Sequence, residues 1–375
     1  MVLTLAFRNL FHDRIRLAVT LVGILFAIVL VAVQLGLYLG ARKMITQMIE
    51  NANGELWIMT FGSKSFEEGG NLTGRERHLA LSVPGVKAVV PLVVSFAEWR
   101  KPAGGSTLSV VVGSDPADGG LEPWNLIEGQ VRSIEAPDAV AVDRTYLADL
   151  GVEKIGDAAQ VENTRVKIVG ITKGIRSFTT APYVFTTLNR ARAILSLQGD
   201  QSNFLLVQLQ PGANVETVRE ALVGRLPGTE VLEQSVFLHR SLDNWLFQTG
   251  AGMALIGGAL LGMLVGTVIV AQTLYSSTKD HLNEFATLRA LGSSAGYIYR
   301  VILFQAAISA AIGYTLGLAI ALLVVHFSEN TPLPIVMTPG LAVTLLVLTI
   351  FMCAISAFAA IMKVTKIDPA MVFSR

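Results

Sequence analysis

Four long apolar stretches, very unevenly spaced, constrain this chain more than any other feature. They cover about residues 17–41, 248–275, 301–327 and 341–362, so a long segment separates the first stretch from the other three. A bilayer core of ~30 Å needs roughly 20 apolar residues of helix, and each stretch is at least that long. The spacing predicts a membrane protein with four spans and one large domain between the first two.

Composition agrees with this division into membrane spans and a water-soluble domain. The chain is 52% hydrophobic and only 15% charged, whereas soluble domains carry about a quarter charged residues. A net charge of +1, without a long basic run, argues against nucleic acid as a partner. Because the one cysteine, Cys353, lies inside the fourth span, no disulfide can form within the chain.

The first stretch is expected to remain as a span. Secretory signal peptides have apolar cores of about 7–15 residues, and the run from Leu17 is longer, with no A-x-A cleavage site after it. The preceding residues, 1–16, place Leu3, Phe7, Leu10 and Phe11 on one helical face. This pattern favours a short helix in the cytoplasmic membrane interface, although a simple extension of the first span also fits.

Lysine and arginine near the ends of the spans predict the orientation. These residues occur before the first span, in the loop 276–300 and in the tail 363–375, whereas the loop 328–340 has none. We therefore expect both termini and the loop 276–300 to be cytoplasmic. The large domain, 42–247, and the loop 328–340 should face the opposite side.

The large domain contains the same succession of patterns twice. An alternating strand-like run, a helical run, a Pro-Gly pair and a second strand-like run follow one another at each end of the domain. The first copy is 55–61, 72–82, Pro84-Gly85 and 86–96, and the second is 203–209, 215–226, Pro227-Gly228 and 229–233. This predicts a duplicated βαβ unit formed by 52–115 and 200–236, unless two common motifs resemble each other by chance.

Between the two copies lies a turn-rich insertion, 116–199. Its strand-like runs at 139–142, 160–162 and 166–171, with a short helical run at 146–150, predict a mostly β lobe. The predicted fold is therefore a four-helix membrane protein with a large extracytoplasmic α+β domain. Trp245 lies just before the second span, where an aromatic residue of the membrane interface is expected.

The chain shows no catalytic or cofactor-binding signature. The motifs G-x-x-x-x-G-K-[ST], H-E-x-x-H and G-x-S-x-G are all absent. The five histidines are scattered without metal-ligand spacing. We therefore expect no catalytic residue, no cofactor and no metal in this chain.

Glycines recur every four residues in the second span, at Gly258, Gly262 and Gly266. Small residues at this spacing let helix backbones come close together in lipid. They predict a tight helix contact, either across a dimer axis or within one chain. Gly36 and Gly40 in the first span have the same spacing, as do Gly313 and Gly317 in the third.

The cores of the spans contain no Asp, Glu, Lys or Arg. Ion-coupled transporters and proton relays usually need such groups, so any energy for transport should come from another protein. The cytoplasmic loop suggests where that protein binds. Residues 279–291 are compatible with a helix that has Phe285, Leu288 and Leu291 on one side, and Gly292 ends it. Such a helix suits a groove in a cytoplasmic partner.

The segment EFATLRALG, residues 284–292, resembles the E-[IF]-[AG]-x-L-[RK]-A-[LIM]-G segment of FtsX-like ABC permeases, the family of MacB and the lipoprotein-releasing permeases. The span layout is similar over essentially the whole chain, and the runs 150–152, 155–157 and 169–171 resemble that family's ectodomain. The tail 367–373 and the length are most similar to the DevC branch.

The resemblance implies a homodimeric permease in the bacterial inner membrane that binds a separate cytoplasmic ABC ATPase dimer, which carries the ATP and Mg²⁺. The implied coupling helix contains Glu284, Phe285, Ala286, Leu288, Arg289, Ala290, Leu291 and Gly292. Closure of the ATPase dimer would move the long helices, and these would move the periplasmic domain. In that domain the duplicated unit corresponds to the "porter" part and the insertion to the "sabre" lobe. DevC-like members imply an HlyD-like adaptor and a TolC-like outer-membrane duct. Unlike MacB, this chain includes no ATPase.

Three functions are compatible with these features. The first is ATP-driven export of a membrane lipid, glycolipid or other amphiphile. The second is an FtsX-like signalling role, in which the chain controls a periplasmic enzyme without transporting a substrate. The third is a membrane-bound enzyme or receptor that acts alone.

Overall fold

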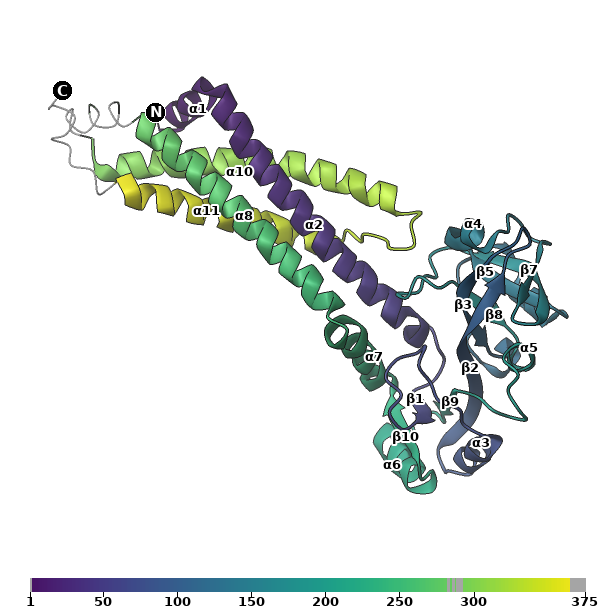
Figure 1. Ribbon diagram of the computed structural model, residues 1–375. Helices are drawn as coiled ribbons and strands as arrows, with labels where there is room; N and C mark the ends of the chain where they lie inside the picture. Colours follow the sequence, from purple (N-terminus) through teal and green to yellow (C-terminus); the bar gives the residue numbers. More distant parts are fainter. Residues whose placement is uncertain (1, 282–283, 285–286, 288–292, 365–375) are drawn as a thin grey trace. The chain divides into compact units, whose positions relative to one another are not determined.

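The computed structural model describes residues 2–281, 284, 287 and 293–364. Four of its helices are long and apolar enough to cross a membrane, which confirms the four predicted spans. They are α2 (Arg14–Glu50), α8 (Ala251–Asp280), α10 (Ala295–Ser328) and α11 (Pro339–Val364) (Figure 1). The chain forms two compact units. We call them the helical unit, with residues up to 40, 253–329 and from 334 onward, and the ectodomain unit, with residues 41–252 and 330–333.

The chain begins with a short helix that is separate from the first span. Helix α1 is Val2–His12, and the helical hydrogen bonding is interrupted at Asp13. The Asp13 side chain accepts a hydrogen bond from the Arg16 N–H at 3.1 Å, which is the contact of an N-terminal cap. The capped break excludes the simple extension of α2.

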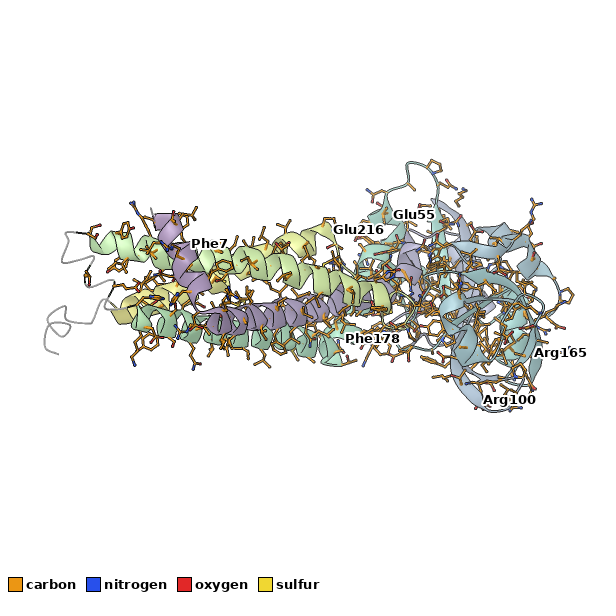
Figure 2. The ribbon with its side chains drawn as sticks, turned by 90° about the horizontal axis from the view of Figure 1, so that it is seen from above. Phe7, Glu55, Arg100, Arg165, Phe178 and Glu216 are labelled. Atoms are coloured by element: carbon orange, nitrogen blue, oxygen red, sulfur yellow. The ribbon has the colours of Figure 1, made fainter. Side chains whose placement is uncertain are left out.

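The apolar face of helix α1 is partly buried and partly exposed. Ala6 and Leu10 are buried, with Ala6 in a cluster that includes residues of α10. Leu3, Phe7 and Phe11 are exposed, and Phe7 projects from the surface of α1 (Figure 2). Leu10 thus lies at the edge of the predicted face that packs into the helical unit, and the other three residues remain exposed.

The duplicated βαβ unit is present and forms one antiparallel sheet. Its strands lie in the order β10–β1–β9–β2, the interleaved arrangement of a split βαβ fold. Gly85 (φ +91°) and Gly228 (φ +87°) occupy equivalent breaks after the two helices, where glycine adopts a left-handed backbone most easily. The first unit is β1 (Leu56–Thr60), α3 (Gly74–Leu81) and β2 (Val86–Arg100), and the second is β9 (Phe204–Leu209), α6 (Val215–Arg225) and β10 (Thr229–Glu233).

Different elements cover the two faces of this sheet. Helices α3 and α6 cover one face, and they lie beside each other in Figure 1. The end of α2, through Met48 and Ile49, and helix α7 (Gln234–Leu242), through Phe237, belong to the aromatic cluster on the other face. Within that cluster the Trp57 ring lies 5.1 Å from the Phe237 ring. The chain segments nearest to the first two spans are thus part of the ectodomain core.

The distal lobe is built around a ring of paired strands. The pairings run β2–β3–β8–β5–β7, and β6 pairs with both β7 and β2, which closes the ring. Its interior is apolar, and the buried Trp99 Nε1 donates a hydrogen bond to the Leu150 carbonyl at 2.9 Å. Arg100 and Arg165 lie in this lobe (Figure 2). The strands are β3 (Ser106–Gly113), β4 (Leu126–Gly129), β5 (Ala139–Asp143), β6 (Ala158–Val161), β7 (Thr164–Thr172) and β8 (Tyr183–Thr186).

One assignment of strands to lobes was wrong. The segment 52–115 was predicted to belong to the first βαβ copy, but β3 pairs with β2 and β8 in the distal lobe. Strand β2 continues beyond the predicted 86–96 and takes part in both sheets. The remaining short helices of the ectodomain unit are α4 (Leu147–Leu150), α5 (Leu188–Ile194), the 3-10 turns Pro116–Asp118, Val131–Glu135 and Arg144–Tyr146, and the π-helical segment η4 (Asp243–Gln248).

Asp143, at the end of β5, joins three segments of the distal lobe. Its side chain is 2% exposed. It accepts hydrogen bonds from the Thr145 N–H at 3.0 Å, the Thr172 hydroxyl at 3.1 Å and the Ile175 N–H at 2.8 Å. Loss of this acceptor would leave buried donors without partners, which costs about 1–3 kcal/mol for each donor.

We expect Asp143→Ala to lower the unfolding temperature of the full chain in detergent by roughly 5–10 °C, because several buried donors lose their acceptor at once. Tryptophan fluorescence during heating measures this transition. Asp149→Ala is the control, because Asp149 is exposed in α4 of the same lobe. Equal unfolding temperatures for the two variants would show that Asp143 does not hold the lobe together.

Candidate functional site

The predicted coupling segment follows α8 at the end of the helical unit that carries α1. Glu284 is helical, and its carboxylate lies 3.1 Å from the Nδ1 of His281. Glu284 also lines a pocket of about 450 Å³ together with Phe7, Arg8 and Phe11 of α1. Sequence reasoning missed this participation of α1. The other predicted coupling residues, Phe285, Ala286, Leu288, Arg289, Ala290, Leu291 and Gly292, lie outside the described residues.

The glycine face of α8 lies against α2 of the same chain. A Cβ atom at Gly258 would lie 2.7 Å from the Gln34 amide nitrogen, and one at Gly262 would lie 3.0 Å from the Leu30 side chain. At Gly266, a Cβ would overlap Ala27 of α2 and crowd Met352 of α11. The three glycines therefore allow close contact of α8 with α2. A role for them across a dimer axis stays a prediction.

Helix α10 approaches α2 in the same way. A Cβ at Gly313 would overlap the side chain of Ile24, and one at Gly317 would lie 2.9 Å from the Ile28 Cγ2. Positions 24 and 28 of α2 thus fit against glycines of α10, and positions 27, 30 and 34 fit against glycines of α8. Because van der Waals contact drives helix packing in lipid, α2 is the central element of the helical unit.

Gly36 and Gly40 in α2 make room for the loop before α11 rather than for a helix. The Val336 N–H donates a hydrogen bond to the Gly36 carbonyl at 3.0 Å. A Cβ at Gly40 would overlap the Pro334 carbonyl oxygen. In lipid each unpaired backbone donor is costly. These two glycines let the loop come close enough to α2 for its backbone N–H to donate a hydrogen bond there.

One face of α2 and α8 remains open in the single chain. The exposed residues Ile15, Val19, Val22 and Phe26 of α2 follow helical spacing. They line a groove of about 1130 Å³ whose opposite wall includes Gln272, Thr273 and Ser276 of α8, and whose end carries Arg14 and Arg16. Hydroxyl and amide groups beside an apolar stripe suit contact with another polypeptide better than contact with acyl chains.

Few polar side chains are buried in the helical unit. The Ser356 hydroxyl of α11 donates to the Thr267 carbonyl of α8 at 2.9 Å, which joins two spans directly. Gln305 and Ser309 in α10 are buried, and among the described residues the Gln305 Nε2 and the Ser309 hydroxyl have no hydrogen-bond partner. Within the same described part of the chain, no group of three His, Cys, Asp or Glu residues is placed to hold a metal ion.

In the ectodomain unit, polar contacts tie the end of α2 to two other elements. The Gln47 side chain donates a hydrogen bond to the Arg176 carbonyl of the distal lobe. The Gln234 side chain at the start of α7 donates to the Ile49 carbonyl at 2.6 Å. Displacement of the end of α2 would therefore act directly on both α7 and the distal lobe.

Comparison with known proteins identifies the family. Residues 17–225, more than half of the chain, match the model of the MacB-like periplasmic core domain. Residues 256–369 match the model of the FtsX-like permease C-terminal domain. This chain belongs to the MacB/FtsX-like permease family. It is therefore a multi-pass inner-membrane permease-family protein whose large domain is of the MacB periplasmic type.

Solved structures of related ectodomains are only distantly similar to this family member. The periplasmic region of MacB from Actinobacillus actinomycetemcomitans is 12% identical, with a TM-score of 0.39, and the match covers 53% of this chain and 98% of that one. The extracellular domain of the noncanonic ABC-type transporter YknZ from Gram-positive bacteria is 16% identical, with a TM-score of 0.35, and the match covers 48% and 99% of the two chains. No curated protein matches the chain.

The glycine contacts give a direct test of the helix packing. We expect Gly266→Leu to destabilise the full chain by about 1–3 kcal/mol, the usual cost of overpacking, because the new side chain would overlap α2 and α11. Gly257→Leu is the matched control, since a Cβ at Gly257 meets no atom within 4 Å. Thermal unfolding of both variants in nanodiscs measures the difference, and equal stability would contradict the proposed packing.

Proposed function

We propose that this protein is the permease subunit of an ATP-driven exporter that works by mechanotransmission. The observation that carries the proposal is the continuity of α2. This helix packs against glycines of α8 and α10 in its first part, and its last turns belong to the ectodomain core. A rigid helix with both ends held in this way can pass movement from one unit to the other.

The energy for this movement comes, in our proposal, from a separate ABC ATPase dimer. No charged residue lies in the cores of the spans, so the chain lacks the groups that ion-coupled transport uses. The segment Glu284–Gly292 is the proposed coupling helix, and the pocket that Glu284 shares with Phe7 and Phe11 extends the docking surface onto α1. In this proposal the chain is a non-catalytic subunit, and its termini and the coupling segment lie in the cytoplasm.

We further propose that the substrate is a membrane lipid, glycolipid or other amphiphile, because movement passed to an ectodomain beside the bilayer suits a substrate taken from the bilayer. An HlyD-like adaptor and a TolC-like duct would complete the route, as in the DevC branch. The residues most similar to that branch, 367–373, lie outside the described residues.

Lipid-stimulated ATP hydrolysis in nanodiscs supports export. Activation of a periplasmic hydrolase without extraction of lipid would support the signalling role instead.

The coupling helix is tested by co-purification. We expect Leu288→Asp combined with Arg289→Glu to abolish recovery of the ATPase with the tagged permease, because the docking helix would lose its apolar contact and reverse its charge. Arg300→Glu makes the same charge change at an exposed position outside the segment and should retain the ATPase. Retention by the double variant, or loss by the control, would contradict this position for the coupling helix.

We propose that a second copy of this chain covers the open groove of α2 and α8, which forms the homodimer. The stripe of Ile15, Val19, Val22 and Phe26 has the spacing of a helix–helix seam. Two such stripes related by a two-fold axis would bury each other and cover the polar groups of the groove wall. Dimer formation would also bring two coupling segments together for an ATPase dimer.

Cysteine cross-linking in membranes tests this face. In a Cys353→Ala background, we expect Val22→Cys to form a disulfide-linked dimer on mild oxidation. Val347→Cys on α11 should remain monomeric. The two positions are matched in residue type and exposure, 63% and 58%, so random collision in the membrane would cross-link both. Cross-linking through position 347 alone would place the dimer contact on α11.

A further inference from the structure

Glu67 is a buried carboxyl group in the segment that follows β1. The residue is 7% exposed. One carboxylate oxygen accepts a hydrogen bond from the Tyr183 hydroxyl at 2.6 Å, and the other accepts one from the Trp245 indole N–H at 3.4 Å. These partners lie 116 and 178 residues away along the chain, so a single side chain joins three remote segments.

The two partners belong to parts of the ectodomain with different roles. Tyr183 is the first residue of β8 in the distal lobe and is 1% exposed. Trp245 lies in η4, the π-helical segment that precedes α8, and its ring is 5.5 Å from that of Phe178. Sequence analysis assigned Trp245 to the membrane interface, but its indole N–H is directed to a protein carboxylate.

The chain is locally irregular where η4 meets α8. Six residues, Asp243–Gln248, form the π-helical segment, and Gly250 then adopts a left-handed backbone with φ +79°. Irregular turns of this kind often mark positions where a helix bends. Because the helix is interrupted here, the side-chain contact of Trp245 provides a separate link between this segment and the rest of the ectodomain unit.

In residues 2–281, 284, 287 and 293–364, no nearby cation balances the charge of Glu67. Within the described ranges, no ion pair of 4.0 Å or less includes this carboxylate. Burial raises the pKa of Glu67, more than the bonds from Tyr183 and Trp245 lower it, and the neighbouring Glu68 raises it further. The pKa of Tyr183, whose phenol faces Glu67, is also raised well above its ordinary value. Burial is the main cause, and the charge of Glu67 is the second.

The two protonation states of Glu67 would hold the partners differently. The carboxylate accepts from the phenol and the indole at once, and hydrogen bonds to a charged group are roughly twice as strong as neutral ones. The protonated acid can donate to the phenol oxygen of Tyr183, which also accepts hydrogen bonds, and its carbonyl can still accept from the indole, but both bonds then join neutral groups. While the carboxyl stays buried, ionisation therefore strengthens the two hydrogen bonds that form the link, although burial of the charge costs folding free energy.

We propose that Glu67 is a proton-sensitive clasp that holds the η4 segment, which leads into α8, to the distal lobe through Trp245 and Tyr183. The clasp is closed when Glu67 is ionised and loosened when it is protonated. The titratable groups that face it are Tyr183 from β8, Glu68 from its own segment and, beyond Tyr183, Tyr146. The consequence for transport rests on the proposed function, because it assumes that movement of α8 is passed to the distal lobe.

The test is hydrogen exchange of the full chain in nanodiscs of phosphatidylethanolamine and phosphatidylglycerol, corrected for intrinsic rates, at pH 8 and at pH 4.5. At pH 4.5, the ordinary pKa of a glutamate, the raised pKa leaves Glu67 mostly protonated. At pH 8 we expect Glu67→Ala to accelerate exchange about tenfold in both 177–186 and 243–250, from the loss of charge-assisted hydrogen bonds. Glu68→Gln, at an exposed neighbouring carboxyl, should change neither segment. An effect of Glu67→Ala confined to the residues around position 67 would overturn the clasp.

Glu67→Gln provides the neutral side chain of the same shape. At pH 8 this variant should exchange like the wild-type chain at pH 4.5, and its exchange should not respond to pH in either segment. If Glu67→Ala fails to fold, Trp245→Phe removes the indole donor, keeps a ring beside Phe178 and should accelerate exchange in 243–250. A wild-type pH response that persists in Glu67→Gln would contradict the proposed proton sensor.

Thermal unfolding separates the clasp from a merely structural role. Since the folded chain binds the Glu67 proton more tightly than the unfolded chain, this group makes folding most favourable below its ordinary pKa. That contribution is lost as pH rises through the raised value. At pH 8, Glu67→Gln should therefore raise the unfolding temperature while local exchange becomes faster. If Glu67 only fills space in the core, Glu67→Gln should change the unfolding temperature and the local protection from exchange in the same direction. Such a result would refute the clasp.

The result can be separated from the proposed function. Exchange of the permease alone needs no ATPase, so it decides the clasp by itself. In a second arm, the ATPase with ATP and vanadate should change exchange at 177–186 in the wild-type chain and not in Glu67→Ala. If exchange at 177–186 in the wild-type chain does not change with ATP and vanadate, the ATP-driven mechanism is contradicted. The clasp is then judged only by the exchange of the permease alone.

Discussion

Close contact with α2 is the constraint on which the helical unit depends. Lipid provides little hydrophobic drive for one helix to bind another, so packing depends on how near two backbones can approach. Glycines of α8 and α10 face α2 at Gly266 and Gly313, where even a methyl group would overlap a side chain of α2. Gly36 and Gly40 receive the loop before α11 in the same way. Through these glycines, α2 contacts α8, α10 and the loop before α11.

The helices that lead to the ectodomain differ in how they do so. Helix α2 is continuous from Arg14 to Glu50, and Met48 and Ile49 are part of the core under the split βαβ sheet. Helix α8 is preceded by the π-helical η4 and by Gly250 with a left-handed backbone. A continuous helix transmits both translation and rotation, whereas an interrupted one can bend. At the interrupted entry, the bond from Trp245 to Glu67 adds a side-chain link to the rest of the ectodomain unit.

Much of this fold could be predicted because its signals are local. Apolar length identified the four spans, and the Pro84-Gly85 and Pro227-Gly228 breaks identified the repeated unit. Strand pairing over long distances could not be predicted, which is why β3 was placed in the wrong lobe and the pairing of Trp99 with Val161 that closes the distal ring was missed. Glu67 gives no signal in the sequence, because its burial arises from partners more than a hundred residues away. The coupling residues stand as a prediction from resemblance, since most of them lie outside the described residues.

The position of the buried ionisable group also bears on mechanism. Proton-coupled transporters place such groups within the membrane spans, where a proton that binds on one side can leave on the other. Here the apolar stretches contain no Asp, Glu, Lys or Arg, and the buried carboxyl Glu67 is in the ectodomain unit. A proton that binds there meets no Asp, Glu, Lys or Arg in the apolar stretches. In our proposal it changes how firmly the segment before α8 is held, and so regulates a movement whose energy is proposed to come from another protein.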